Sequence, residues 1–282
     1  MPSEPPVLPS RLGGNVADGE AGQHAGTGPE ALFSLRNRLA LVTGSSRGIG
    51  LVLAAGLARH GAAVVLNGRH RPTLEEAAGT LEGAGARVHV RPFDVADPDA
   101  AEAGIAAVER EIGPLDILVN NAGLQHRAPL ENFPAAEWER LRRTNLDSVL
   151  FMGQAAARRM IGRGRGKIIN IASVQSELAR PNIAPYGATK GAVKMLTRGM
   201  ATEWARHGLQ VNAIAPGYFA TELNRALVED AEFTAWLARR TPAGRWGRTE
   251  ELVGAAVFLA SDASSFVNGH LLAVDGGITA CL

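Results

Sequence analysis

Short apolar runs alternate with longer helical stretches along most of this chain, and this alternation constrains the fold more than any other feature. The runs that we expect to form strands are residues 39–42, 63–67, 87–90, 115–119, 167–172, 210–214 and 271–275. Near-continuous apolar runs of about four to eight residues are typical of strands that are buried on both faces of a parallel sheet. Helices between such strands imply right-handed crossovers, so the sequence predicts an α/β fold with a doubly wound parallel sheet.

The helical stretches follow these runs and complete the expected architecture. Helices are expected up to about residue 60, from about 72, from 98, from about 135 to 160, from 186 to about 207, from 221 to 240 and from 250 to 260. No internal boundary or repeat interrupts residues 31–282, so we expect a single domain there. Residues 1–30 are rich in Gly, Pro and small polar residues without periodicity, which predicts a disordered tail.

Composition excludes several classes of function. The 282 residues carry a net charge of +1, from 29 basic and 28 acidic side chains, so neither nucleic acid nor an anionic membrane is an expected partner. No apolar run approaches the ~20 residues of a membrane span. Cys281 is the only cysteine, and the N-terminal residues lack the pattern of a signal peptide. We therefore expect a cytoplasmic location.

A glycine cluster follows the first expected strand. Gly44, Gly48 and Gly50 lie where this strand turns into the first helix. Glycines at such a turn allow the backbone to approach a pyrophosphate, and the helix N-terminus supplies N–H groups to it. A lone glycine cluster is a weak signal, but this position in the chain is the one that a dinucleotide site requires. A Walker phosphate loop is excluded, because no Lys-Ser/Thr pair follows the glycines.

The end of the second expected strand bears on which dinucleotide is bound. A carboxylate there would hold the adenosine ribose hydroxyl of NAD and repel a 2′-phosphate. The chain instead has Asn67-Gly68-Arg69. Arg69 and Arg47 are candidates for binding a 2′-phosphate, since guanidinium groups suit phosphate, and the alternative is that both are solvated surface arginines. The sequence thus predicts that NADP(H) is preferred over NAD(H).

A tyrosine and a lysine lie four residues apart in the helix that follows the fifth expected strand. This spacing places Tyr186 and Lys190 on one helix face, and Pro185 suits the first turn. A neighbouring ammonium lowers a phenol pKa from ~10, which would let Tyr186 exchange a proton with an alcohol or a ketone. Ser173 follows the preceding strand, at the edge where such sheets bind ligands. Tyr-Lys pairs also occur by chance, so the interpretation depends on the other motifs.

Other polar residues have two possible roles each. Asp94, after the third expected strand, could hydrogen-bond adenine or simply cap a loop. Asn121 and Gly123 suit a turn that also lines the cofactor. Asn145, within an apolar helix face, is costly unless its amide is satisfied. It either forms a core hydrogen bond or holds a water molecule beside Lys190.

Together these motifs resemble the short-chain dehydrogenase/reductase family. The resemblance rests on Thr43-Gly44-x-x-x-Gly48-x-Gly50, Asn120-Asn121-Ala122-Gly123, Asn145, Ser173 and Tyr186-x-x-x-Lys190, and it covers about Phe33 to the C-terminus. It implies a Rossmann fold, oxidoreductase activity with NAD(P) and a homotetramer or homodimer. In the catalytic roles that it implies, Tyr186 is the general acid/base, Lys190 lowers its pKa and holds the nicotinamide ribose, Ser173 binds the reacting oxygen and Asn145 anchors a relay water.

The same resemblance implies a set of cofactor contacts. They are Gly44, Ser46, Arg47, Gly48, Ile49, Gly50, Asn67, Arg69, Asp94, Val95, Asn121, Ala122, Gly123, Tyr186, Lys190, Pro216, Gly217, Phe219 and Thr221.

Three loops are expected to meet above the nicotinamide, namely residues 124–129, 174–180 and 218–240. These loops are more polar than a pocket for a lipid or a steroid would be. They are similar to the loops of family members that interconvert D-gluconate and 5-keto-D-gluconate with NADP(H). We therefore expect a sugar-acid substrate and no metal. The candidate substrate contacts are Arg127, Ser173, Gln175, Glu177, Tyr186 and Tyr218, with His126 as a second candidate for the carboxylate and Asn182 for a hydroxyl. Each could also be a polar residue that only stabilises its loop.

Two alternatives stay open at this point. Within the fold, the enzyme could reduce another polyol or a 3-oxoacyl thioester. In a different class, the chain could be a dinucleotide-binding regulator without catalysis. The complete set of Asn145, Ser173, Tyr186 and Lys190 argues against a regulator, because binding alone does not need it.

Overall fold

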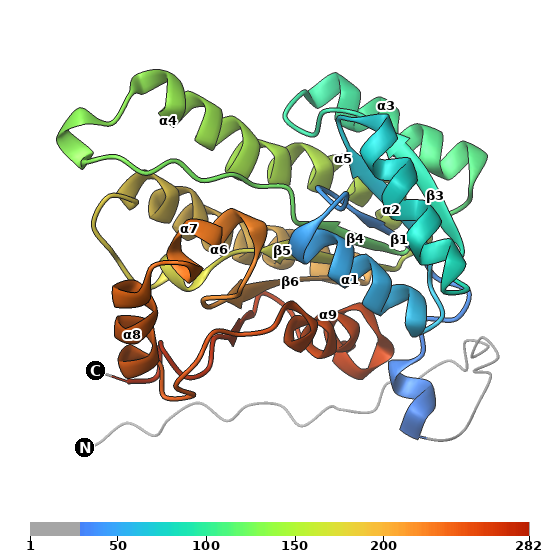
Figure 1. Ribbon diagram of the computed structural model, residues 1–282. Helices are drawn as coiled ribbons and strands as arrows, with labels where there is room; N and C mark the ends of the chain where they lie inside the picture. Colours follow the sequence, from blue (N-terminus) through green and yellow to red (C-terminus); the bar gives the residue numbers. More distant parts are fainter. Residues whose placement is uncertain (1–28, 282) are drawn as a thin grey trace, which may run out of the picture.

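A parallel β-sheet forms the centre of the computed structural model, which describes residues 29–281 (Figure 1). Within these residues the sheet has seven strands in the order β3-β2-β1-β4-β5-β6-β7, and every neighbouring pair is parallel. The strands are β1 (Leu39–Val42), β2 (Ala63–Gly68), β3 (Val88–Pro92), β4 (Ile117–Asn120), β5 (Gly166–Ile171), β6 (Leu209–Pro216) and β7 (Leu271–Val274). The doubly wound sheet that the sequence predicts is confirmed.

Helices cover both faces of this sheet. They are α1 (Gly48–Arg59), α2 (Arg71–Gly83), α3 (Pro98–Glu111), α4 (Ala135–Arg142), α5 (Ser148–Arg163), α6 (Ala184–Trp204), α7 (Arg225–Val228), α8 (Ala231–Arg240) and α9 (Val253–Ala260). Side chains alternate along each strand, so Val42 packs into the core under α1, α2 and α9, while Leu41 packs into the core under α3, α5 and α6. Figure 1 shows α1 and α9 on one side of the sheet and α3 and α5 on the other.

The central strand β1 has neighbours from distant parts of the chain. Val42 lies opposite Leu66 of β2 on one side and opposite Val119 of β4 on the other. The strand order reverses between β1 and β4, and such a switch point opens a crevice beyond the carboxyl ends of the strands. The crevice is therefore expected over the β1–α1 turn and the end of β4.

The long helix expected from about Ala135 to Met160 is instead two helices. A π-helical turn, Arg143–Asp147, separates α4 from α5, and α5 continues to Arg163. A π turn adds a residue to the helical repeat, and it is frequent at functional sites. The apolar periodicity of the sequence does not reveal it, because the residues on both sides stay helical.

The helix expected from Thr221 to Arg240 is also interrupted. It consists of a 3₁₀ turn, Glu222–Asn224, followed by α7 and α8. The side chain of Asp230 accepts hydrogen bonds from the backbone N–H groups of Glu232 and Phe233, at 3.0 Å each, and thus starts a new helix. The helix expected from Glu250 begins as a 3₁₀ turn, Thr249–Leu252, before α9.

The expected disordered tail, residues 1–30, lies outside the described residues except for Pro29 and Glu30. These two begin a 3₁₀ turn, Pro29–Phe33. Among residues 29–281, no helix combines the length and the apolarity that crossing a membrane would require.

Candidate active site

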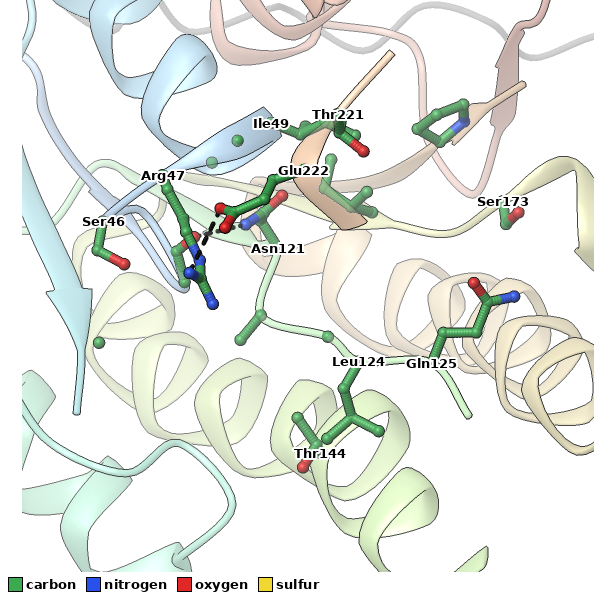
Figure 2. A pocket seen from close by; sticks show the side chains of 18 of the residues that line it. Ser46, Arg47, Ile49, Asn121, Leu124, Gln125, Thr144, Ser173, Thr221 and Glu222 are labelled. Carbon is green, nitrogen blue, oxygen red and sulfur yellow. Dashed lines mark hydrogen bonds and ion pairs between the residues drawn. The ribbon is translucent and has the colours of Figure 1, made fainter. Parts of the chain in front are cut away.

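A cavity of about 1520 Å³ opens over the carboxyl ends of the central strands. This exceeds the ~300–1,000 Å³ of most small-molecule sites, so it has room for a dinucleotide together with a small substrate. Figure 2 shows Ser46 and Arg47 on one side of this cavity and Gln125 and Ser173 on the other. We call these two sides the cofactor end and the substrate end.

The β1–α1 turn at the cofactor end requires glycine at particular positions. Gly44 and Gly48 have φ angles of 61° and 58°, in the left-handed region that other residues avoid. A Cβ atom on Gly50 would lie 2.4 Å from the carbonyl oxygen of Gly44. A Cβ atom on Gly48, in contrast, would have no protein atom within 4 Å, so this glycine faces open space.

The end of β4 fixes this turn through hydrogen bonds. The Oγ1 atom of Thr43 accepts from the backbone N–H groups of Asn121 and Ala122, at 2.9 and 3.0 Å. The Nδ2 atom of Asn121 donates to the carbonyl oxygens of Thr43 and Gly44, at 2.8 and 3.1 Å. Asn121 thus supports the glycine turn in addition to lining the cavity.

The N-terminus of α1 is left free to bind an anion. Its N-cap residue, Arg47, makes no side-chain cap, and its first turn contains no acidic residue. The unpaired N–H groups and the positive end of the helix dipole therefore face the cavity. Together with the open space beside Gly48, this arrangement fits the pyrophosphate of a dinucleotide.

The end of β2 carries no carboxylate toward the cavity. Gly68, Arg69 and His70 line it there, and Arg69 is exposed. Arg47 is also exposed and forms an ion pair of 3.3 Å with Glu222, which Figure 2 marks. Arg47 and Arg69 thus both line the cofactor end, together with the carboxylates of Glu76 and Glu222.

Two other residues expected at the cofactor end form hydrogen bonds with the protein backbone. Asn67 lines the cavity although it is fully buried, and its Nδ2 atom donates to the carbonyl oxygens of Arg91 and Phe93, so it also ties β2 to the end of β3. Asp94 lines the cavity but also accepts a hydrogen bond of 3.0 Å from the N–H of Ala96. The remaining expected contacts also line the cavity, namely Ser46, Ile49, Val95, Ala122, Gly123, Pro216, Gly217, Phe219 and Thr221.

Tyr186, Lys190 and Ser173 all line the cavity. The Nζ atom of Lys190 donates to the carbonyl oxygen of Ile171 at 2.7 Å and lies 5.8 Å from the centroid of the Tyr186 ring. Burial lowers the pKa of Lys190 to about 8. Burial raises the pKa of Tyr186, and a hydrogen bond with Ser173 opposes this increase. Burial is thus the largest influence on the pKa of Tyr186, and the lowering effect expected from Lys190 stays a prediction.

Ser173 lies two residues beyond the end of β5 and caps the following 3₁₀ turn, Val174–Ser176. Its Oγ atom accepts a hydrogen bond of 3.1 Å from the N–H of Gln175. The hydroxyl proton remains available to donate, as binding of a reacting oxygen requires.

Asn145 lies behind the wall of the cavity and is fully buried in the π turn. Its Oδ1 atom accepts from the N–H of Leu124 at 2.9 Å, and its Nδ2 atom donates to the carbonyl oxygen of Leu124 at 2.9 Å. Of its two possible roles, the structure shows the core hydrogen bond. These bonds hold the start of the loop that follows β4.

The substrate end includes some of the expected residues and excludes others. Arg127, Gln175 and Tyr218 line the cavity. Glu177 does not, because it is exposed and its carboxylate pairs with Lys194 on α6. The two second choices, His126 and Asn182, do not line the cavity either. The Nδ1 atom of His126 lies 3.4 Å from the Oε2 atom of Glu137, and the backbone carbonyl oxygen of Asn182 accepts a hydrogen bond from the N–H of Ala128. Within residues 29–281, no cluster of His, Cys, Asp and Glu could hold a metal ion.

Comparison with known proteins agrees with this geometry. A family model described as "Enoyl-(Acyl carrier protein) reductase" matches residues 44–279, which is most of the chain. The chain belongs to the short-chain dehydrogenase/reductase family. It is an oxidoreductase, like the other enzymes of this family.

Several members of the family are similar over nearly their whole length. The chain is 65% identical to gluconate 5-dehydrogenase of Gluconobacter oxydans over 89% of this chain and 98% of that protein. It is 53% identical to 5-keto-D-gluconate 5-reductase of Escherichia coli over 88% and 97%. The crystal structure of a gluconate 5-dehydrogenase from Burkholderia cenocepacia, in complex with NADP and tartrate, is 58% identical and superimposes with a TM-score of 0.87 over 89% of this chain and 98% of that one.

Three residues of this family member were not singled out from the sequence. Gln125 lines the substrate end and accepts a hydrogen bond of 3.2 Å from Arg127. Arg180 lines the same end, and Glu222 pairs with Arg47 across the cofactor end. Gln125 and Arg180 lie in loops that we expected above the nicotinamide, so polar residues within these loops were the available signal. No sequence signal indicates the partner of Glu222.

Proposed function

We propose that this short-chain dehydrogenase/reductase interconverts D-gluconate and 5-keto-D-gluconate by hydride transfer at C5 with NADP(H). The observation that carries the proposal is that Ser173, Tyr186 and Arg127 line one cavity. A sugar acid with a reacting carbon near one end and a carboxylate at the other needs both features. The activities named for the Gluconobacter and Escherichia relatives support the same substrate pair.

In the reducing direction, Tyr186 acts as the general acid. Its raised pKa keeps the phenol protonated at neutral pH, so it can donate this proton to the C5 oxygen. Bound NADPH supplies the hydride that C5 accepts. The hydroxyl of Ser173 donates a hydrogen bond to the same oxygen and stabilises the negative charge that develops on it.

Lys190 stabilises the phenolate that Tyr186 becomes. With a pKa of about 8, it is mainly an ammonium at neutral pH, and it lies close to the phenol ring. Its charge favours the ionised tyrosine, which in the oxidising direction accepts the proton of the C5 hydroxyl. Asn145 contributes by fixing the backbone of Leu124, from which the substrate loop with Arg127 extends.

NADP(H) is the preferred cofactor in this proposal. Arg47 and Arg69 both line the cofactor end, and no carboxylate from the end of β2 would repel a 2′-phosphate. Charge-assisted hydrogen bonds contribute about 1.5–3 kcal/mol each, which corresponds to about ten- to a hundredfold in affinity. The ratio of kcat/KM for NADPH and NADH measures this preference, and equal values or a preference for NADH would contradict it.

A substrate panel tests the activity itself. We expect NADPH oxidation, followed by absorbance, to be fastest with 5-keto-D-gluconate and slow with neutral keto-polyols. The aromatic cluster around Tyr218 and Phe233 offers an apolar wall that favours the second candidate, a 3-oxoacyl thioester reductase. Faster turnover of an acetoacetyl thioester than of 5-keto-D-gluconate would support that candidate and refute the sugar-acid assignment.

We also propose that the enzyme is a cytoplasmic homodimer or homotetramer. The family resemblance supports assembly, and so do large apolar side chains on the surface, since Met195 on α6 and Phe266 before β7 are 65% and 102% exposed. Apolar groups so exposed in one copy are candidates for burial against another. Light scattering of the purified protein at several concentrations would measure the subunit number.

A further inference from the structure

A second arginine lines the substrate end and approaches it from a different loop. Arg180 lies between the 3₁₀ turn Val174–Ser176 and α6, whereas Arg127 lies in the loop after β4. Both line the cavity together with Tyr218, which follows β6. Side chains from three separate loops therefore face one volume.

The guanidinium group of Arg180 is held in place by an aromatic ring. Its Cζ atom lies 5.1 Å from the centroid of the Phe233 ring on α8. Phe233 is itself packed against Tyr218, Trp236 and Trp246, with ring centroids 5.7, 5.2 and 6.0 Å away. A cation over an aromatic face is stabilised, and its position is restricted, while its N–H groups remain free for another partner.

No carboxylate of the described residues neutralises this pair of arginines. Arg47 pairs with Glu222 and Lys194 pairs with Glu177, but neither Arg127 nor Arg180 forms an ion pair within residues 29–281. The Nε atom of Arg180 is buried and has no hydrogen-bond partner. A buried donor without an acceptor is unfavourable, so an anionic ligand that supplies an acceptor there would bind favourably.

The two cations influence each other and the tyrosine between their loops. Burial lowers the pKa of Arg127, and the charge of Arg180 lowers it further. Burial raises the pKa of Tyr218, which the charges of Arg180 and Arg127 oppose. Like charges held near each other destabilise the protein, and one carboxylate placed between them would offset this repulsion for both.

We propose that Arg180 binds the carboxylate of the substrate jointly with Arg127, while Phe233 fixes the orientation of its guanidinium group. The inference deepens the proposed function and rests on it to the extent that the substrate is a sugar acid. A carboxylate held by two arginines from different loops has a defined position. This position sets which carbon of the chain reaches Tyr186, so the pair determines specificity for chain length as well as for charge.

Kinetics of arginine variants test the proposal first. Arg180→Gln should raise KM for 5-keto-D-gluconate at least about tenfold, the order expected for the loss of a charged hydrogen bond, with a smaller fall in kcat. Arg180→Lys should recover part of this loss. KM for NADPH should not change, and Arg110→Gln, on the exposed side of α3, is the matched control. An unchanged KM for 5-keto-D-gluconate in Arg180→Gln would overturn the inference and leave the proposed function standing.

Ligand binding measured without turnover tests the anion site of Arg127 and Arg180 separately from the proposed activity. In the wild type saturated with NADP, sodium tartrate, a small dicarboxylate, should raise the melting temperature, and Arg180→Gln or Arg127→Gln should abolish this increase. If the wild type does not turn over 5-keto-D-gluconate but shows this arginine-dependent increase, the proposed function fails and the anion site stands. If tartrate protects Arg180→Gln as well as it protects the wild type, the inference fails.

A purely structural role for Arg180 predicts a different result. If this side chain only braced α8 through Phe233, Arg180→Gln would lower the melting temperature without ligand and would weaken binding of neutral and anionic ketones equally. Under the proposal Arg180→Gln weakens binding of anionic ketones far more than binding of neutral ketones, because the lost contact is with the carboxylate. A lower melting temperature combined with equal losses for both kinds of ketone would overturn the inference.

Discussion

The two ends of the cavity are built in different ways. At the cofactor end, the shape of the site is set mainly by the backbone. Gly44 and Gly50 allow a turn that larger side chains would block, and Thr43 and Asn121 hold this turn through four hydrogen bonds. At the substrate end, side chains from three loops line the cavity. Among residues 29–281, the guanidinium of Arg127 is hydrogen-bonded only to the side chain of Gln125 in its own loop.

This difference shows where the chemistry and the specificity of the enzyme reside. Binding a dinucleotide requires a fixed backbone shape, which rigid strand ends can supply. Choosing one substrate among many ketones requires particular side chains, which loops can exchange without disturbing the sheet. Tyr186 lines the same cavity and transfers the proton in the proposed reaction. The two ends should therefore fail in different ways when they are altered.

The largest effect, a fall in kcat, is expected for substitution of Tyr186. Tyr186→Phe keeps the ring but removes the exchangeable proton, so kcat should fall by roughly 10²–10⁴. Binding of NADPH, measured by its fluorescence, should remain close to that of the wild type. A variant that retains more than about a tenth of the wild-type kcat would show that another group transfers the proton.

The next effect is expected at the cofactor end. A Cβ atom in Gly50→Ala would overlap the carbonyl oxygen of Gly44 and the amide of Asn121, and overpacking costs about 1–3 kcal/mol. We expect NADPH binding to weaken by about ten- to a hundredfold, with a lower melting temperature. The control is Gly79→Ala on α2, where no atom lies within 4 Å of the new Cβ. Equal behaviour of the two variants would contradict the rigid-turn interpretation.

The smallest effect is expected at the substrate end. Arg127→Ala should raise KM for 5-keto-D-gluconate about tenfold with less change in kcat, because a contact remote from C5 contributes uniform binding. Neutral keto-polyols should be poor substrates of both the wild type and the variant. A drop in kcat larger than the rise in KM would place Arg127 at the reacting carbon instead of the carboxylate.

The sheet and the cofactor end could be predicted from the sequence because their signals are local. Strands such as Leu39–Val42 are buried on both faces and therefore apolar throughout. The glycines that follow have positions that only a tight turn before a helix explains. Ser173, Tyr186 and Lys190 were found for the same reason, since strand ends and helix spacing determine where their side chains lie.

The remaining features depend on contacts between distant segments. Arg180 stacks on Phe233, and Asn145 bonds to Leu124, and neither partner can be inferred from local spacing. The pKa of Tyr186 also depends on how much water burial removes from the phenol, which the sequence does not show. Glu177 was expected at the substrate, but a cation on α6 lies nearer to it.

The position of the transferred hydride tests the account most directly. We expect that reduction of 5-keto-D-gluconate with NADPH deuterated at the reactive C4 position yields D-gluconate labelled at C5, which NMR spectroscopy would identify. This result requires the C5 ketone at the cofactor and the carboxylate at the far end of the cavity. Label at another carbon, or the C5 epimer of D-gluconate as the main product, would contradict the account.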